Sequence, residues 1–248
     1  MSGTLRVGTS GFAYRAWAPA FYPAGLRNED LLRSYAARLT ACELNNTFYR
    51  QPTESAVRGW LARTPEAFRF AVKAQRGGAM RALLGDDQAE TVAWLSRPFD
   101  LFGDRLGSVL YRVPGDIART EERHERLARL LDLWPPRFPL TMEFQHGTWH
   151  VDETFALLRA HGAVLCATDL DEMDDPPFVR VTGSFLYLRL RRTAYPDADL
   201  DAWAARIAPF LDAGLDAYAF FRHDETGRGP ELALALSEAV GRSTGEAS

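Results

Sequence analysis

The sequence contains a single lysine, Lys73, because every other residue among its 29 Lys and Arg residues is arginine. A primary amine can lose its proton when it is buried and can attack a carbonyl carbon, whereas a guanidinium stays charged and planar. Lys73 stands near the end of the apolar run 68–74, which is typical of a buried strand. The residue is therefore a candidate for chemistry that arginine cannot perform, although a codon bias against lysine would give the same composition.

Other residues with chemical potential also stand at the ends of β-branched or aromatic runs. They are Glu43 and Asn45, Arg112, Glu143 and Gln145, Asp169, Arg189 and Arg191, and Arg222 with His223 and Asp224. An unpaired charge in a protein interior costs several kcal/mol, so these groups must pair with one another or face a ligand. Their opposite charges nearly balance, which fits either a ligand site or a structural layer of ion pairs.

Short strand-like runs alternate along the chain with segments of helical periodicity. The expected strands are Leu5–Thr9, Ala41–Asn45, Phe68–Ala74, Ser108–Val113, Leu140–Phe144, Ala163–Thr168, Phe185–Leu190 and Ala217–Phe221. The expected helices are Asn28–Arg38, Thr53–Arg63, Asp86–Phe102, Arg119–Leu133, Asp152–Ala160, Ala198–Leu211 and Gly229–Val240. Eight strands alternating with helices in a chain of 248 residues predict an α/β fold, a (β/α)8 TIM-type barrel.

The sixth connection breaks this pattern, because Leu170–Thr182 contains Pro176-Pro177 and four acidic residues. We expect a loop there in place of the sixth helix. A doubly wound open sheet is the alternative fold, but no G-x-G-x-x-G motif follows the first strand. No break in composition marks a second domain, so the prediction is one barrel over residues 1–240 with a flexible tail at 241–248.

Bulk composition narrows the class of protein. The net charge is −4 and no basic stripe is present, so charge gives no indication of nucleic-acid binding. Cys42 and Cys166 lie in apolar runs without metal-ligand spacing, which favours buried thiols in a reducing compartment. No apolar stretch reaches the length of a membrane span and no signal region opens the chain, so we expect a cytoplasmic protein.

Several motifs together resemble the YecE-like proteins, the family known as domain of unknown function 72. They are Val7–Phe12 with Tyr14 and Trp17, Phe21-Tyr22-Pro23, Glu43–Tyr49, Trp60, Thr64-Pro65, Phe68–Lys73, and Glu143-Phe144 with His146 and Trp149. The resemblance implies a TIM-type barrel but supplies no reaction. The chain departs from the family pattern at strand ends: Arg112 replaces the usual Gln, Gln145 the usual Arg and Arg191 the usual His. Arg222-His223-Asp224 replaces Asn-Asn-Asp.

Because active sites of TIM barrels lie at the carboxyl ends of the strands, the strand-end residues predict one site there. The predicted catalytic residues are Glu43, Lys73, Glu143, His146 and Asp169. Lys73 would act as a charged donor to an anion, Glu43 or Glu143 as general acid or base, and Asp169 and His146 as orienting groups. The predicted substrate-binding residues are Ser10, Tyr14, Trp17, Asn45, Arg112, Gln145, Trp149, Arg191, Arg222 and His223.

Three alternatives for these residues stay open. The aromatic side chains of residues 11–25 and Trp149 could wall a pocket or seal the barrel mouth as a small core. The carboxylates could hold a divalent cation, but the surrounding arginines disfavour it, so we expect neither a metal nor another cofactor. Lys73 could also be a Schiff-base nucleophile.

The strand-end arginines and Lys73 predict that the partner is a small anionic molecule. The leading hypothesis is an enzyme acting on a phosphorylated or sugar-like anion, with hydrolysis favoured because no dinucleotide motif is present. The alternative is a non-catalytic barrel that binds a metabolite or a protein and has lost part of the family's polar site.

Overall fold

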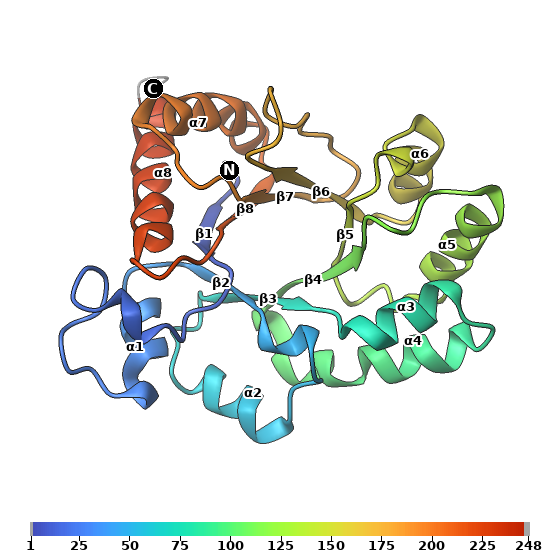
Figure 1. Cartoon of the computed structure of the whole chain (residues 1–248), viewed down its shortest axis with the longest axis horizontal. Coiled ribbons are helices and arrows are strands. Elements are labelled where there is room, and N and C mark those ends of the chain that lie inside the picture. The colour runs from blue at the N-terminus through green and yellow to red at the C-terminus, as the bar shows by residue number, and fades with distance from the viewer. Residues whose placement is uncertain (1, 246–248) are drawn as a thin grey trace.

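Eight parallel strands form the centre of the molecule. The computed structural model describes residues 2–245, and Figure 1 looks along the barrel with helices around it. The strands are β1 (Leu5–Thr9), β2 (Ala41–Leu44), β3 (Arg69–Lys73), β4 (Leu106–Val113), β5 (Leu140–Phe144), β6 (Val164–Asp169), β7 (Phe185–Leu190) and β8 (Asp216–Phe221). All eight predicted strands are confirmed, as is the (β/α)8 barrel.

Helices cover the outside of the sheet. They are α1 (Leu31–Ala36), α2 (Glu54–Leu61), α3 (Arg76–Leu84), α4 (Gln88–Ser96), α5 (Glu121–Leu133), α6 (Asp152–Ala160), α7 (Asp197–Asp212) and α8 (Arg228–Gly245). Short 3-10 segments follow β1, β2 and β5. No helix lies between β6 and β7 within the described chain, which confirms the predicted loop at the sixth connection.

The strands are paired in the order β1-β8-β7-β6-β5-β4-β3-β2. Contacts between β1 and β2 close the ring. The Gly11 amide donates to the Glu43 carbonyl at 2.8 Å next to an isolated β-bridge between Ser10 and Glu43, and the Thr40 amide donates to the Val7 carbonyl at 3.2 Å. Pairing between β5 and β6 is short, because only Thr141 with Val164 and Met142 with Leu165 are in register. The carboxyl-terminal halves of β5 and β6 therefore separate.

Alternation along the strands divides the core into two parts. A small cluster fills the barrel interior and consists of Ala41, Ala71, Leu110, Val164, Cys166, Phe185, Tyr187, Tyr218 and Phe220. A larger cluster lies between the strands and the helices, and it contains Cys42, Leu44 and Val72. The predicted faces of β2 are thus confirmed: Cys42 points outward, which leaves Glu43 on the inner face. Both cysteines are buried and unpaired.

The segment after β3 differs from the prediction. Helix α4 and a 3-10 segment (Arg97–Arg105) occupy the region where one helix over Asp86–Phe102 is predicted, and α3 lies before this region, where no helix is predicted. Gly77 and Gly78 have low helix propensity, so the sequence gives α3 little local support. Gly78 is needed for packing, because a Cβ atom there would lie 2.5 Å from the ring of Trp94. Pro98 limits the continuation of α4.

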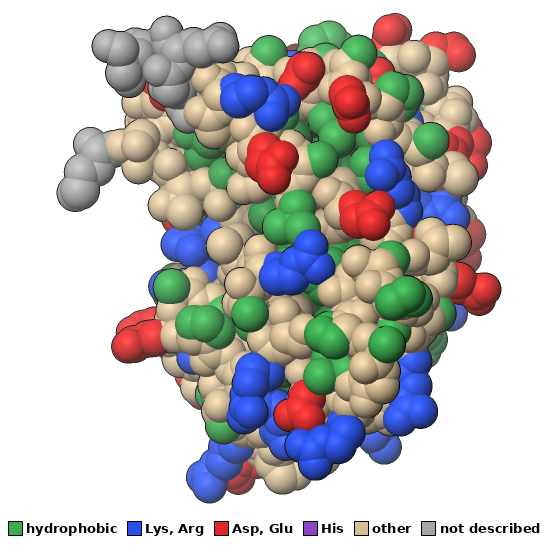
Figure 2. Space-filling model, turned by 90° about the vertical axis from the view of Figure 1, so that its left-hand side faces the viewer, with side chains coloured by type: hydrophobic (Ala, Val, Ile, Leu, Met, Phe, Trp, Pro, Cys, Tyr) green, Lys and Arg blue, Asp and Glu red, His purple; other side chains and the backbone are tan. Residues whose placement is uncertain are grey.

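The last helix is longer than predicted. It continues to Gly245, whereas the sequence placed its end at Val240 and a flexible tail after it. Residues 241–245 therefore belong to α8, and the rest of the predicted tail lies outside the described residues. None of the helices within residues 2–245 combines the length and the apolar composition that a bilayer-spanning segment needs. On the face that carries α1, α7 and α8, basic and acidic side chains are interspersed (Figure 2).

Candidate functional site

Glu43 lies at the centre of the barrel mouth. Its side chain is fully buried and accepts a hydrogen bond from Ser10 Oγ at 2.5 Å and one from Tyr187 Oη at 2.9 Å. Arg189 donates to both carboxylate oxygens, each at 3.0 Å. Burial alone would raise the pKa of Glu43, but Arg189 and Lys73 outweigh it and hold the pKa well below its usual range. Glu43 is therefore a fixed anion.

Arg189 joins Glu43 to a second buried carboxylate, Glu143. Its Nη1 lies 2.6 Å from Glu143 Oε1, which also accepts a hydrogen bond from Thr168 Oγ1 at 2.9 Å. Arg112 Nε donates to the other oxygen at 2.5 Å. Burial would raise the pKa of Glu143, but Arg189 and Arg112 lower it to about 2. Both glutamates are thus ionised at neutral pH, and their oxygens are occupied by donors.

Lys73 completes this layer from β3. Its Nζ lies 2.9 Å from Glu43 Oε1 and donates to the side-chain oxygen of Asn45. Burial and the nearby Arg189 lower the pKa of Lys73 to about 8, against the opposing effect of Glu43. The amine is therefore largely protonated at pH 7 but can release its proton close to neutrality. We call Glu43, Lys73, Arg112, Glu143 and Arg189 the mouth layer.

Arg191 lies beside the mouth layer without a partner of its own. It follows β7 on the same face as Arg189, and its guanidinium makes no hydrogen bond or ion pair with any residue of the described chain. Burial and the charge of Arg189 lower the pKa of Arg191. Cations are brought together here without a matching number of carboxylates, so the region has an excess of positive charge.

His223 and Tyr14 form the rim of the mouth. Their rings stack with centroids 4.8 Å apart and an interplanar angle of 4°. Burial, Arg191 and Lys73 lower the pKa of His223, so its imidazole is neutral at pH 7. Tyr14 also lies 3.3 Å from the amide nitrogen of Asn45. The predicted binding residues Ser10, Tyr14, Asn45 and His223 therefore belong to one rim.

Asp169 does not join the mouth layer. It accepts hydrogen bonds from Tyr195 Oη at 2.9 Å and Arg192 Nε at 2.8 Å, and Trp203 Nε1 lies 3.3 Å away. These residues belong to α7 and to the segment before it, outside the barrel. The expectation that Asp169 orients groups in the central site is corrected by this geometry, because β6 turns Thr168 inward and Asp169 outward.

The predicted tryptophans are core residues. Trp17 is fully buried, donates to the carbonyl of Asp224 at 2.7 Å and stacks on Tyr22. Trp149 is also fully buried and stacks on Phe144. Neither side chain is exposed to a ligand. Both therefore fit the alternative in which the aromatic residues form a small core that seals the barrel mouth.

The remaining predicted residues lie at the periphery. His146 uses Nδ1 to accept from the Thr148 amide at 3.2 Å, which caps a 3-10 turn and gives it no contact with the mouth layer. Arg222 Nη1 lies 3.7 Å from Asp171 Oδ2. Gln145 is exposed and lines the cavity described next. The predicted role of His146 as an orienting group is thus not supported by its contacts.

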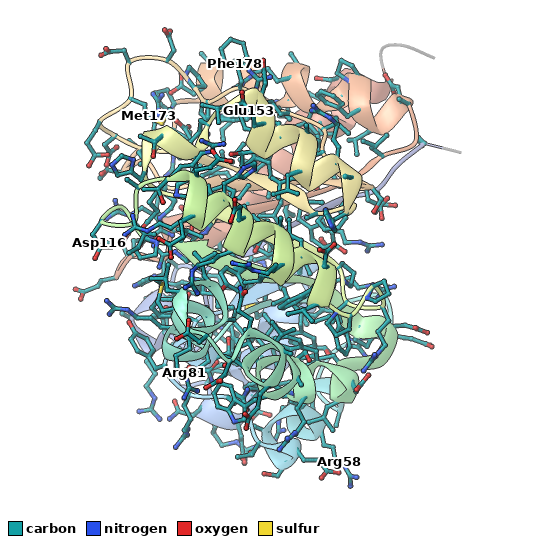
Figure 3. All side chains as sticks on the ribbon, turned by 90° about the vertical axis from the view of Figure 1, so that its right-hand side faces the viewer. Arg58, Arg81, Asp116, Glu153, Met173 and Phe178 are labelled. Carbon is teal, nitrogen blue, oxygen red and sulfur yellow. The ribbon has the colours of Figure 1, made fainter. Side chains whose placement is uncertain are left out.

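A cavity of about 600 Å³ opens where β5 and β6 separate. We call it the β5–β6 slot. Its wall includes residues from both faces of β6, with Cys166 and Thr168 from inside the barrel and Leu165 and Ala167 from outside. It also contains Glu143, Phe144, Gln145, His150, Phe155, Leu170, Met173, Asp175, Pro176, Pro177, Phe178, Arg180 and Arg191. Figure 3 labels Met173 and Phe178 on the loop over this cavity, and Glu153 of the neighbouring α6.

Arg189, Tyr187 and Thr168 are site residues that the sequence-based selection left out. Period-two alternation on β7 placed Tyr187, Arg189 and Arg191 on one face, and that signal was sufficient to include Arg189. Within residues 2–245, no three side chains among His, Cys, Asp and Glu are grouped as metal ligands. The donors that surround Glu43 and Glu143 are cations and hydroxyls, which do not fit a divalent cation.

Comparison with known proteins places the fold and the motifs in one family. The family model described as "Protein of unknown function DUF72" matches residues 6–247. The chain belongs to the DUF72 family. A DUF72 family protein of Thermotoga maritima MSB8 shares 25% identity, with a TM-score of 0.80 over 96% of this chain and 99% of that chain. The resemblance seen in the sequence is therefore confirmed.

Three further proteins match this chain with lower identity or over a shorter length. A DUF72 family protein of Enterococcus faecalis V583 has 15% identity and a TM-score of 0.79, covering 96% of each chain, so it supports the fold alone. The UPF0759 protein YunF of Bacillus subtilis strain 168 is 25% identical over 182 residues, which are 66% of this chain and 62% of YunF. A methyltransferase from Methanosarcina mazei shares only the fold, at 11% identity and a TM-score of 0.54 over 99% of this chain and 94% of that chain.

Proposed function

We propose that this DUF72 protein is an enzyme that binds a small organic anion at the barrel mouth and hydrolyses it. The observation that carries the proposal is the unpartnered guanidinium of Arg191 beside the mouth layer. Two carboxylates, Glu43 and Glu143, face the cations Lys73, Arg112 and Arg189 before Arg191 is added. An anion that docks on Arg191 compensates the excess positive charge with charge-assisted hydrogen bonds.

Lys73 and His223 supply the proton transfers. Lys73, with its pKa lowered to about 8, is protonated at pH 7 and serves as the general acid. His223 is neutral at the same pH and serves as the general base, because its pKa is lowered. His223 takes a proton from water as that water adds to the electrophilic atom. The bond to the leaving group breaks with its electron pair, and Lys73 protonates the leaving atom.

The glutamates have a different role from the one that the sequence suggested. Glu43 and Glu143 are held ionised by Arg189, so neither carries a proton to donate, and their low basicity makes them poor bases. Glu43 instead holds the ammonium of Lys73 at 2.9 Å. We therefore assign Glu43 and Glu143 as positioning residues.

Anion binding is tested by calorimetric titration with acetate and inorganic phosphate. Arg191→Gln is expected to weaken binding at least tenfold, because it removes the unpaired charge. Arg242→Gln is the matched control, since Arg242 pairs with Asp201 on the exposed surface. Equal affinities for wild type and both variants would refute the proposed anion site.

Hydrolysis is tested with phenyl phosphate and with hippurate, an anionic amide. Lys73→Met is expected to lower kcat about 100-fold or more while leaving KM within a few-fold. The pH profile of the wild type should fall below the lowered pKa of His223 and above about pH 8, where Lys73 loses its proton. A protein that binds both compounds and returns them unchanged would support the alternative, a non-catalytic binding barrel.

A further inference from the structure

The wall of the β5–β6 slot is polar at one end and mostly apolar elsewhere. At one end the slot reaches Glu143, Thr168 and Arg191, which lie together at the barrel mouth. The remaining wall is mostly apolar, formed by side chains such as Leu165 and Phe155. A ligand that filled this space would place a charged group at one end and apolar surface along the rest.

The volume sets the size of such a ligand. About 600 Å³ lies in the range of cavities that hold small organic molecules, and it exceeds what an isolated phosphate or acetate would occupy. The opening results from the short pairing of β5 with β6, which stops at Met142 and Leu165. Backbone pairing that would close a regular barrel is absent beyond these residues, so the cavity is built into the described sheet.

The N-terminus of a helix is a usual anion position in barrel folds, and in α8 a carboxylate of the protein occupies it. The carboxylate of Asp224 accepts from the amide of Arg228 at 3.1 Å and from the amide of Gly229 at 2.6 Å, at the start of α8. These amides at the N-terminus of the helix would otherwise attract a phosphate. These amides are therefore already bonded within the described chain, whereas the guanidinium of Arg191, which borders the slot, is not.

The loop over the slot exposes apolar surface. Phe178 is 84% exposed and Leu170 is 37% exposed, and both belong to the cavity wall. Burial of these side chains against a ligand would remove apolar area from water, which favours binding. Arg180 stacks on Phe155 from the same loop, with its Cζ 4.5 Å from the ring centroid. This contact fixes one wall of the slot.

From these observations we infer that the substrate is an amphipathic organic anion. Its carboxylate or phosphate group pairs with Arg191, and its apolar chain or ring occupies the β5–β6 slot. This inference rests on the proposed anion site and adds the chemical class of the substrate.

The test is a homologous series of probes: acetate, butanoate, hexanoate and octanoate, titrated into the whole protein. Affinity should rise about fourfold with each added methylene until the slot is filled. Ala167→Leu is expected to reduce this gain while acetate still binds, because the larger side chain narrows the slot. Ala202→Leu is the control, since Ala202 borders a separate cavity beside α7.

A second variant avoids any dependence on a core substitution. Phe178→Ser changes an exposed side chain and should reduce the affinity for hexanoate about threefold or more, whereas Leu133→Ser on α5 should not. Phenylacetate and phenyl phosphate then distinguish a carboxylate from a phosphate head group. The tighter of the two identifies the preferred head group.

The outcomes separate the two proposals. If acetate binds through Arg191 but affinity does not rise with chain length, the inference about the slot is wrong and the anion site stands. If the rise persists unchanged in Ala167→Leu and Phe178→Ser, the apolar group binds elsewhere and the inference is also wrong. If no anion binds, the proposed function itself fails.

Discussion

Thr168 and Asp169 are consecutive residues of β6 that belong to two different polar networks. Thr168 faces the barrel interior and donates to Glu143 at 2.9 Å. Asp169 faces outward and binds Arg192 and Tyr195 beside α7. The two networks hold buried carboxylates at the same end of the sheet, but the inner one borders the slot of about 600 Å³, whereas the outer one borders a smaller cavity of about 200 Å³. Strand parity, more than proximity to a strand end, decides which carboxylate joins the site.

The networks also differ in charge. The outer one pairs the single carboxylate of Asp169 with the single cation Arg192, and neutral donors complete it. The inner one contains two carboxylates and three cations, to which Arg191 adds a fourth. A balanced pair has no need of a further ion, whereas the inner excess attracts one. We therefore expect the outer network to stabilise the fold and the inner one to bind a ligand as well.

The largest difference should follow from removing one arginine from each network. Arg189→Met leaves two buried carboxylates without their shared partner, so the free energy of unfolding should fall by about 3–5 kcal/mol. Arg192→Met removes a cation that is 21% exposed, and the loss should be only about 1–2 kcal/mol, because Tyr195 and Trp203 still donate to the buried carboxylate of Asp169. Urea unfolding measures both. If the free energy of unfolding fell equally in the two variants, the greater burial of Arg189 would not increase its contribution to stability.

Acid should weaken the inner network. The pKa of Glu143 is lowered to about 2, so its contribution to stability is complete above the ordinary pKa of 4.5 and is lost as the pH falls toward 2. Glu143→Gln should therefore flatten the dependence of the unfolding free energy on pH in this window, by on the order of 3 kcal/mol. The exposed Glu153→Gln is the control. A wild-type slope retained in Glu143→Gln would contradict the assignment.

Asp169→Asn tests whether the outer network is separate from the ligand site. The amide keeps a hydrogen-bond acceptor for Tyr195 but loses the charge that pairs with Arg192, so stability should fall by about 1–2 kcal/mol. Acetate affinity should stay within twofold of the wild type. A loss of affinity comparable to that of Arg191→Gln would show that the two networks are coupled.

Most of the fold could be predicted because periodicity and length are properties of single segments. Eight apolar runs alternating with helical segments leave few arrangements other than a barrel. The helix α3 was missed because one of its glycines, Gly78, serves packing against Trp94, a contact that only the folded chain reveals. The end of α8 was placed too early, since residues 241–245 are small and polar and give weak helical signals.

The site was predictable only in part, for a geometric reason. On β2 and β5 the polar residues alternate with apolar ones, so their common face could be read from the sequence. On β6 the run from Ala163 to Ala167 is apolar or small at every position, and nothing local tells whether Thr168 or Asp169 faces inward. The sequence does not tell whether Trp17 and Trp149 lie in the core or in a pocket wall, because aromatic side chains occur in both places.

The smallest effect is expected from Thr168→Val, which removes a single hydrogen bond from the inner network. Glu143 keeps both arginine partners, Arg112 and Arg189, so the carboxylate remains compensated. The loss of stability should be about 0.5–1 kcal/mol, which is less than for Asp169→Asn. Because valine keeps the shape of threonine, affinity for hexanoate should change less than twofold. A larger loss of affinity would mean that the hydroxyl of Thr168, which already lines the slot, makes a hydrogen bond to the ligand itself.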